Sequence, residues 1–196
     1  MTKRILDVVG ALCGLAFVAP FTPFIALAIA RESGRPIFVG LARVSEGRLV
    51  RVWKFRTMIK GASTMKTSLS HLNERNDGPF FKIKDDPRLT KIGRLLRMLR
   101  VDEFPQFWNV LKGELTLIGP RPHEPEEVAA YPPEFKHLAN AKAGLTGLSQ
   151  VMGASALPFL AELEYDATYL KNASLGLDLK ILWKTVVIFL TDPTGV

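Results

Sequence analysis

The stretch VDEFPQFWNVLKGELTLIGPRP, residues 101–122, contains the features that decide how this chain folds and what chemistry it offers. Two adjacent carboxylates, Asp102 and Glu103, precede an aromatic segment with Pro105 near its start. Asp is favoured at a helix N-cap and Pro in the first turn, so we expect a helix to begin here. The positive end of a helix stabilises an anion by about 0.3–1 kcal/mol, which favours ionised carboxylates able to attack phosphorus or bind a divalent cation. The simpler alternative is that the pair only caps the helix.

The same stretch ends in Gly-Pro-Arg-Pro, which places Arg121 between two prolines. Each proline fixes its own φ and favours an extended residue before it, so the loop that holds Arg121 is stiff. A guanidinium with little freedom to lose on binding is a good phosphate ligand. Upstream, Lys54 and Arg56 alternate along an expected strand and share one face, where they can meet a diphosphate. A solvated strand face is the simpler alternative for these two cations.

Residues 8–30 form an apolar stretch without a charged side chain. Its length suffices for a helix of about 20 residues that crosses a bilayer. Pro20 and Pro23 interrupt it, and each removes a backbone N–H and disfavours a helical residue before it. We therefore expect a break near Ala19 and two half-helices, each too short to span.

Basic residues flank this apolar stretch on both sides, with Arg31 and Arg35 on the C-terminal side. Positive charge prefers the cytoplasmic side of a membrane, so the flanks predict that both ends stay on one side. A re-entrant hairpin over residues 1–32 satisfies this preference, and a signal peptide is the alternative. We expect Asp7 to face the other half-helix or the headgroups, because a lone carboxylate in hydrocarbon is costly.

Residues 33–196 mix strand-like and helix-like patterns, which predicts an α+β fold: a small cytosolic α/β portion with short strands and interfacial amphipathic helices. A polar stretch at 60–79 predicts a surface loop or an irregular helix. Arg97 belongs to a basic stripe opposite leucines, which suits a membrane interface or, alternatively, a soluble core. The expected strands are 36–39, 49–55 and 115–118, and the expected helices are 86–99, 104–111, 162–170 and 175–190.

Composition narrows the class of partner. The chain of 196 residues carries a net charge of +7, which favours polyanions such as acidic lipid or nucleotide phosphates. Nucleic acid is not expected, because no helix-turn-helix, zinc-ligand or ribonucleoprotein-type pattern is present and 47% of residues are hydrophobic. The one cysteine, Cys13, excludes an internal disulfide and a thiolate metal cluster. The three histidines, including His123, are scattered and are interpreted as surface or hydrogen-bonding residues rather than metal ligands.

Taken together, these segments resemble the catalytic unit of the bacterial sugar transferase family, the small monotopic polyprenyl-phosphate phosphoglycosyltransferases. The resemblance covers nearly the whole chain. It rests on KRILD (3–7), the proline-broken apolar stretch, KFRTM (54–58), DGPFFKIKDDPRLTKIG (77–93), VDEFPQFWNVLKGE (101–114), GPRP (119–122) and YDATYLKNASLGLDLKILWKT (165–185).

The resemblance implies transfer of a sugar-1-phosphate from a nucleotide diphosphate sugar, with a UDP-sugar expected, to undecaprenyl phosphate. It implies Mg²⁺ as cofactor, membrane lipid as a partner and the cytoplasmic face of the bacterial inner membrane as the location. The product, an undecaprenyl-diphosphate sugar, begins exopolysaccharide or lipopolysaccharide synthesis. The sugar is not readable from the sequence, and both a monomer and a homodimer remain open.

The resemblance also implies roles for individual residues. Asp102 is the expected nucleophile, which attacks the β-phosphorus and forms a sugar-phosphoryl enzyme. Glu103 serves the metal or the lipid phosphate, and either carboxylate can hold Mg²⁺. By matching position, the phosphate ligands are Arg97 and Arg121, and the surrounding polar set contains Asp166 and Asp178, each of which is alternatively a helix-stabilising charge.

Two departures from the family pattern stand out. The membrane break reads Ala19-Pro20 where members often carry Ser-Pro, so the two prolines alone must break the helix. Ala154 stands where an arginine commonly follows the QVNG motif, so one expected cation is missing. Larger members carry an additional N-terminal membrane portion, and we expect this chain to be a minimal form. The competing hypotheses are a non-catalytic basic membrane adaptor and a membrane phosphohydrolase.

Overall fold

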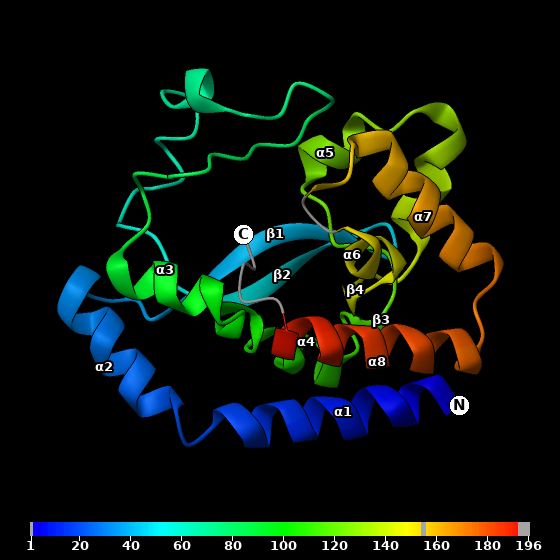
Figure 1. The fold of residues 1–196 in the computed structure, drawn as a ribbon, viewed down its shortest axis with the longest axis horizontal. Helices are drawn as coiled ribbons and strands as arrows, with labels where there is room; N and C mark the ends of the chain where they lie inside the picture. Colours follow the sequence, from blue (N-terminus) through cyan, green and yellow to red (C-terminus); the bar gives the residue numbers. More distant parts are fainter. Residues whose placement is uncertain (1, 154–155, 192–196) are drawn as a thin grey trace.

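The computed structural model describes residues 2–153 and 156–191, which form a mixed fold of helices and two small sheets (Figure 1). The predicted α+β class is confirmed at this level. In chain order the elements are α1 (Thr2–Val18), α2 (Thr22–Ser33), β1 (Phe38–Ser45), β2 (Arg48–Phe55), η1 (Ser70–Leu72), α3 (Lys91–Met98), η2 (Val101–Glu103), α4 (Gln106–Lys112), β3 (Thr116–Ile118), α5 (Pro125–Ala129), η3 (Pro133–Asn140), β4 (Gly144–Thr146), α6 (Leu148–Met152), α7 (Phe159–Lys171) and α8 (Leu175–Thr191).

The predicted break in the N-terminal apolar stretch is confirmed. Helix α1 ends at Val18 and α2 begins at Thr22, with a bend of 61° between them. Pro20 lies in the connecting turn, and Pro23 lies in the first turn of α2, where its missing N–H costs nothing. Among the described residues, no single helix is long and apolar enough to cross a bilayer; this bent pair passes that test together, by length and composition alone.

Helix α1 is fastened to the rest of the chain by Asp7, which is 5% exposed. Its carboxylate accepts hydrogen bonds from the Thr116 hydroxyl at 2.8 Å and from the Leu117 N–H at 2.7 Å. The expectation that Asp7 faces the other half-helix or the headgroups is therefore wrong. A buried carboxylate needs donors, and β3 supplies two of them where α1 crosses it.

A second polar contact fixes α1 against α4. The Arg4 guanidinium donates to the carbonyls of Val110 at 2.7 Å and Leu111 at 2.6 Å, in the last turn of α4. These carbonyls lie at the negative end of the helix, where a cation is stabilising. Helices α1 and α4 thus meet through polar contacts as well as apolar ones.

The predicted hairpin is confirmed, although its first strand is longer than expected. Strands β1 and β2 pair from Phe38 opposite Phe55 to Ser45 opposite Arg48. Glu46 and Gly47 both have positive φ angles, as a two-residue hairpin turn requires. The hairpin carries Lys54 near the end of β2, next to η2.

Asn109 of α4 fixes the distance between the hairpin and the segment that precedes α4. Its side-chain oxygen accepts from the Trp53 N–H at 3.1 Å, and its amide nitrogen donates to the Arg51 carbonyl at 2.8 Å. The side chain thereby satisfies the free edge of β2 in the manner of a neighbouring strand. Because α4 follows η2 directly, this contact also sets the position of Glu103.

The core lies where α1, α4, α7 and α8 surround the parallel pair β3 and β4 (Figure 1). Tyr169 of α7 is fully buried there; its hydroxyl donates to Asp178 at 2.7 Å, and Asp178 lies 3.4 Å from Lys3. This chain of contacts holds α8 beside α1. The buried core residues are Ala11, Val52, Val110, Leu115, Leu117, Ile118, Ala143, Tyr169 and Ile181.

Two predicted helices begin later than expected. Helix α3 starts at Lys91 rather than at residue 86, because Thr90 caps it by accepting from the Gly93 N–H at 2.8 Å. Glu32 of α2 accepts from two further N–H groups of that first turn. Helix α4 starts at Gln106 rather than at residue 104, because the separate turn η2 precedes it.

We predict that Asp7→Ala lowers the free energy of unfolding by about 1–3 kcal/mol, because two buried donors lose their acceptor. Urea unfolding in detergent, followed by circular dichroism, measures this. Asp85→Ala is the matched control, since Asp85 is 83% exposed and its surface pair with Arg94 is worth at most about 1 kcal/mol. Equal stabilities of the two variants would contradict the docking role of Asp7.

Candidate active site

Asp102 lies in η2, the single turn between α3 and α4, and is 6% exposed. Arg100 precedes the turn in the left-handed region, with a φ of 54°, which reverses the chain after α3. The N-cap of α4 is Pro105, which makes no side-chain capping bond. The expectation that Asp102 caps the following helix is therefore wrong. Helix capping therefore does not explain why the Asp102 carboxylate is buried.

Three cations from separate elements surround Asp102 and Glu103. Lys54 of β2 forms an ion pair with Glu103, with 2.5 Å between Nζ and Oε1. Arg97 of α3 and Arg121 of the loop after β3 add further attraction to Glu103. The structure thus brings together five residues that the sequence predicts for the site, from four parts of the chain. Their roles in binding or catalysis stay predictions.

The pKa values of the two neighbouring carboxylates are shifted in opposite directions. Burial, with a contribution from the charge of Glu103, raises the pKa of Asp102 to about 6, although Lys54 and Arg97 act in the opposite direction. Burial also acts to raise the pKa of Glu103, but Lys54, Arg121 and Arg97 outweigh it and hold that pKa below its usual value. Glu103 is therefore ionised throughout the physiological pH range, while the pKa of Asp102, about 6, lies just below neutral pH. Paired carboxylates with separated pKa values are typical of sites with divided roles.

Arg97 is aligned by a contact outside the carboxylate pair. Its Nε donates to the Thr57 hydroxyl at 3.2 Å, and Thr57 directly follows the KFR segment of β2. The guanidinium is thus tied to the same strand end that carries Lys54. Two of the three cations are therefore positioned by the same end of the hairpin.

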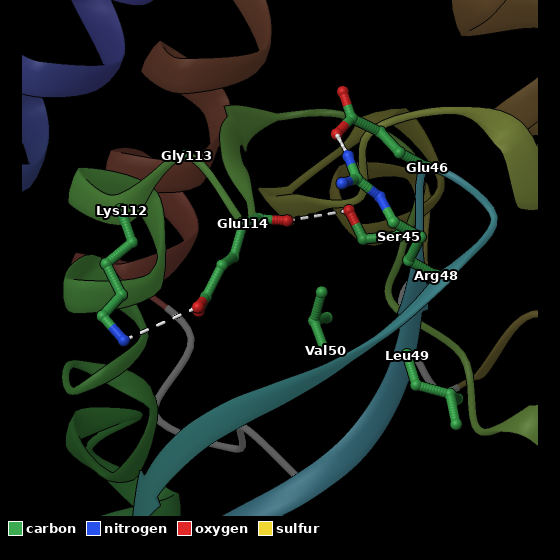
Figure 2. A pocket seen from close by; sticks show the side chains of 8 residues that line it. All are labelled: Ser45, Glu46, Arg48, Leu49, Val50, Lys112, Gly113 and Glu114. Atoms are coloured by element: carbon green, nitrogen blue, oxygen red, sulfur yellow. Dashed lines mark hydrogen bonds and ion pairs between the residues drawn. The ribbon is translucent and has the colours of Figure 1, made fainter.

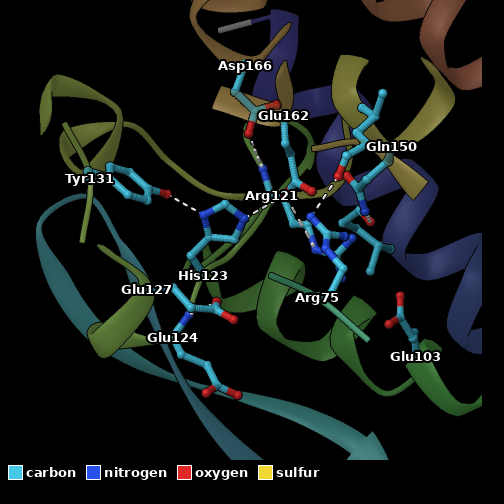
Figure 3. Close-up of polar contacts among 12 residues, drawn as sticks. Arg75, Glu103, Arg121, His123, Glu124, Glu127, Tyr131, Gln150, Glu162 and Asp166 are labelled. Carbon is cyan, nitrogen blue, oxygen red and sulfur yellow. Dashed lines mark hydrogen bonds and ion pairs between the residues drawn. The ribbon is translucent and has the colours of Figure 1, made fainter. Parts of the chain in front are cut away.

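The loop that carries Arg121 is held from behind by α7 (Figure 3). The Arg121 N–H donates to the Asp166 carboxylate at 3.0 Å, and the Arg121 Nε lies 3.9 Å from Glu162. Burial raises the pKa of Asp166 to about 6. Asp166 therefore belongs to the support of the loop, which is where the prediction of a surrounding polar set places it.

Two residues of this support were missed by sequence reasoning. His123 and Glu162 are buried, and the His123 Nε2 lies 2.6 Å from the Glu162 carboxylate. The interpretation of His123 as a hydrogen-bonding residue is confirmed, but its partner lies on α7. The available signals were weak: His123 follows Arg121 by two positions, and Glu162 precedes Asp166 by one helical turn.

Arg56 and Asp178 make their hydrogen bonds elsewhere. Arg56 is buried and donates to the Ser33 hydroxyl at 2.9 Å and to the Gly34 carbonyl, so it closes the end of α2. Asp178 accepts from Tyr169 and pairs with Lys3. These contacts do not join them to the group around Asp102, and two buried nitrogens of the Arg56 guanidinium, Nε and Nη1, have no hydrogen-bond partner among the described residues. The predicted phosphate and polar roles of the two residues stay predictions.

Comparison with known proteins now identifies the family. The family model described as bacterial sugar transferase matches residues 1–192. The chain belongs to the bacterial sugar transferase family. The chain is similar to the UDP-galactose-lipid carrier transferase of Erwinia amylovora, at 35% identity over 96% of this chain and 40% of that protein. It is also similar to the exopolysaccharide production protein ExoY of Sinorhizobium fredii, at 31% identity over 95% of this chain and 84% of that protein.

Other members of the bacterial sugar transferase family match over the same length of this chain. The undecaprenyl-phosphate galactose phosphotransferase of Salmonella typhimurium is 34% identical over 96% of this chain and 40% of its own length. The chain thus spans about two fifths of the length of several curated relatives that it matches.

The carboxylates of Asp102 and Glu103 have the chemistry of ligands for a hard divalent cation. Among the residues that the structure describes, no group of three or more His, Cys, Asp or Glu side chains gathers as a metal cage. Mg²⁺ does not require one, because it usually binds one or two carboxylates and completes its shell with water and substrate phosphates. Asp102 and Glu103 supply such oxygen ligands. Ala154, the position of the missing family arginine, lies outside the described residues.

A hollow of about 330 Å³ lies between the hairpin turn and the end of α4 (Figure 2) and contains no predicted site residue. Its lining residues are Ser45, Glu46, Arg48, Leu49, Val50, Lys112, Gly113 and Glu114. We therefore base the site on the converging charges rather than on a cavity.

We predict that Asp102→Asn stabilises the fold at pH 7.5 by about 1–3 kcal/mol. The folded protein binds this proton with a pKa of about 6 against the ordinary 3.8, so the stability that Asp102 contributes falls as the pH rises through that window. Removal of the charge recovers that loss at pH 7.5 and brings no gain near pH 4. Urea unfolding at the two pH values measures this, with the exposed Asp85→Asn as control. A destabilised variant at pH 7.5 would show that the ionised carboxylate is held by contacts stronger than its burial cost.

Proposed function

We propose that this chain transfers a sugar-1-phosphate from a nucleotide diphosphate sugar to undecaprenyl phosphate, which yields an undecaprenyl-diphosphate sugar and a nucleoside monophosphate. The observation that carries the proposal is the buried Asp102 beside Glu103, with Lys54, Arg97 and Arg121 converging on the pair. Three cations around two carboxylates suit a reaction between anionic phosphates.

The names of the relatives support the same reaction class. One relative is the undecaprenyl-phosphate galactose phosphotransferase of Salmonella typhimurium. Another, from Aeromonas hydrophila, is named as a UDP-N-acetylgalactosamine–undecaprenyl-phosphate N-acetylgalactosaminephosphotransferase. Since both names combine a sugar with undecaprenyl phosphate and differ in the sugar, we propose a UDP-sugar as donor and leave the sugar itself to experiment.

In the first step, a carboxylate oxygen of Asp102 attacks the β-phosphorus of the donor. The bond from that phosphorus to the bridging oxygen breaks, and the electron pair leaves with the nucleoside monophosphate. Asp102 is then esterified to the sugar phosphate. Arg97, Arg121 and Lys54 offset the negative charge on the phosphates as the two anions approach.

In the second step, a phosphate oxygen of undecaprenyl phosphate attacks the same phosphorus from the vacated side. The bond to Asp102 breaks, and its carboxylate is regenerated. Mg²⁺, when bound through Asp102 or Glu103, neutralises phosphate charge and polarises the phosphoryl oxygens. Glu103 keeps its charge through both steps, so it is suited to hold the cation or to orient Lys54.

The acceptor is a lipid, and the surface next to the site is apolar. Along α1, α2 and α8 large apolar side chains are exposed, among them Phe24 at 73%, Trp183 at 69% and Leu190 at 74%. Exposed apolar surface of this extent marks a membrane or protein contact. We propose that this side rests in the cytoplasmic leaflet of the bacterial inner membrane as a monotopic anchor, with the bent α1–α2 pair re-entrant.

The competing hypotheses have less support. The membrane adaptor required that Asp102 and Glu103 only cap a helix, and Pro105 occupies the N-cap of α4 without a side-chain capping bond. The phosphohydrolase would use the same nucleophile with water as acceptor. It predicts turnover without the lipid, which the transferase does not.

We predict that the native protein releases nucleoside monophosphate from one or more UDP-sugars over many turnovers only when undecaprenyl phosphate and Mg²⁺ are both present, and that without the lipid release stops at one equivalent per enzyme. Asp102→Asn removes the nucleophile, so turnover falls by about 10³-fold or more, while the exposed Asp85→Asn retains it. Scintillation counting of the lipid product, with a panel of radiolabelled UDP-sugars, measures turnover and names the sugar. Activity that survives in Asp102→Asn would refute the nucleophile, and lipid-independent release well beyond one equivalent would favour the phosphohydrolase.

We predict that replacing both Pro20 and Pro23 by leucine straightens the N-terminal pair into one helix that crosses the membrane. The prolines terminate α1 and open α2, and leucine restores the missing hydrogen bonds. In a Cys13→Ser background, single cysteines at Thr2 and Glu164 report the side of each end to a membrane-impermeant thiol reagent. Both label from the same side in the native sequence and from opposite sides in the double variant. Unchanged labelling would contradict a proline-dependent break.

A further inference from the structure

Helix α7 presents two buried carboxylates, one helical turn apart, to the loop after β3. Asp166 accepts from the backbone N–H of Arg121 at 3.0 Å, and Glu162 lies 2.6 Å from the Nε2 of His123. Both carboxylates are at most 2% exposed. The segment from Arg121 to His123 is therefore held at both ends by the same face of one helix.

The orientation of the His123 ring is fixed by a second contact. Its Nδ1 pairs with the hydroxyl of Tyr131, and Phe80 packs against the ring edge. Glu162 is an ionised acceptor, so the Nε2 of His123 donates to it. Tyr131, His123 and Glu162 thus form one continuous buried row of hydrogen-bonded side chains.

The charge of Glu162 lies directly behind the Arg121 guanidinium. The two side chains are 3.9 Å apart at their closest charged atoms, too far for a hydrogen bond but close for a charge pair in buried surroundings. Arg121 and Arg75 are the cations that compensate the buried Glu162, and its hydrogen bond with His123 is the main effect that lowers the pKa against burial. The Arg121 side chain is itself 39% exposed.

Figure 3 shows the geometry that results: His123 lies between Tyr131 and Glu162, and Arg121 lies between this row and Glu103. The Arg121 guanidinium therefore has a carboxylate behind it and a carboxylate in front of it. Without the rear charge, the balance of attraction on the guanidinium would shift toward Glu103 and away from an incoming phosphate.

We propose that Glu162, oriented by His123, is a positioning residue that holds the Arg121 guanidinium ready for substrate phosphate. The inference rests on the proposed function, because that function supplies the phosphate. Nothing in the chemistry requires Glu162 to touch the substrate. Its contribution passes through Arg121, and it should vanish when Arg121 is removed.

A double-mutant cycle tests the coupling between Glu162 and Arg121. The measured quantity is the affinity for inorganic diphosphate in the presence of Mg²⁺, determined by isothermal titration calorimetry on the full chain in detergent. Glu162→Gln keeps the size and the acceptor for His123 but removes the charge, and should weaken binding about threefold to tenfold. Arg121→Ala weakens binding further, and Glu162→Gln adds no additional loss in that background. Glu164→Gln, the same change at an exposed position of α7, leaves affinity unchanged.

Several results would overturn the inference. The first is an equal loss of affinity from Glu162→Gln with and without Arg121, which indicates a general structural role. The second is an unchanged affinity in Glu162→Gln. The third is diphosphate binding that does not depend on Arg121. If thermal denaturation shows Glu162→Gln to be unfolded, Tyr131→Phe replaces it in the cycle, because it removes only the hydroxyl that aligns His123. Tyr131→Phe should weaken diphosphate binding about twofold to threefold, again only when Arg121 is present. Unchanged binding in Tyr131→Phe overturns the inference.

The transferase assay keeps the two proposals separate. A native protein that binds diphosphate through Arg121 and Glu162 but releases no nucleoside monophosphate from any UDP-sugar would refute the proposed function and leave the coupling intact. Turnover of the native protein, with no coupling between Glu162 and Arg121 in the cycle, would support the function and refute the positioning role.

Discussion

The carboxylate of Asp7, buried against β3, is the contact on which the arrangement of this protein depends. It joins the bent N-terminal pair to the strand from which the Arg121 loop departs, through Thr116 and Leu117. Helix α7 fixes the same loop through Asp166. The apolar N-terminal pair and the charged site are thus connected through one three-residue strand and the loop that follows it.

Charge distribution at the site follows from competition between burial and nearby cations. Asp102 is buried more fully than it is compensated, whereas Glu103 has Lys54 at contact distance. A protein that maximised its stability would not bury a carboxylate with so little compensation by cations. The cost is understandable if a poorly solvated anion has to react, since a nucleophile surrounded by strong donors would be held back by them.

Sequence patterns predicted the features that depend on local rules. The two prolines located the break near Ala19, the turn residues located the hairpin, and the family resemblance selected Arg97 and Arg121 as phosphate ligands. Local rules failed where distant segments decide the outcome. A capping rule cannot distinguish an N-cap from the separate turn η2, the donors of Asp7 lie on β3, and the partner of His123 lies on α7.

The docking of α1 by Arg4 and Asp7 also has a consequence for how this chain can vary. Because no flexible linker separates the N-terminal pair from the site, one residue inserted in α1 after Asp7 would turn the rest of the helix by about 100° and advance it by about 1.5 Å. The exposed apolar side chains beyond the insertion would then leave the face they share. Insertions and deletions should therefore accumulate in the loop at residues 60–79 and be rare in α1, because the length of that helix sets the spacing between the exposed apolar side chains and the carboxylate site.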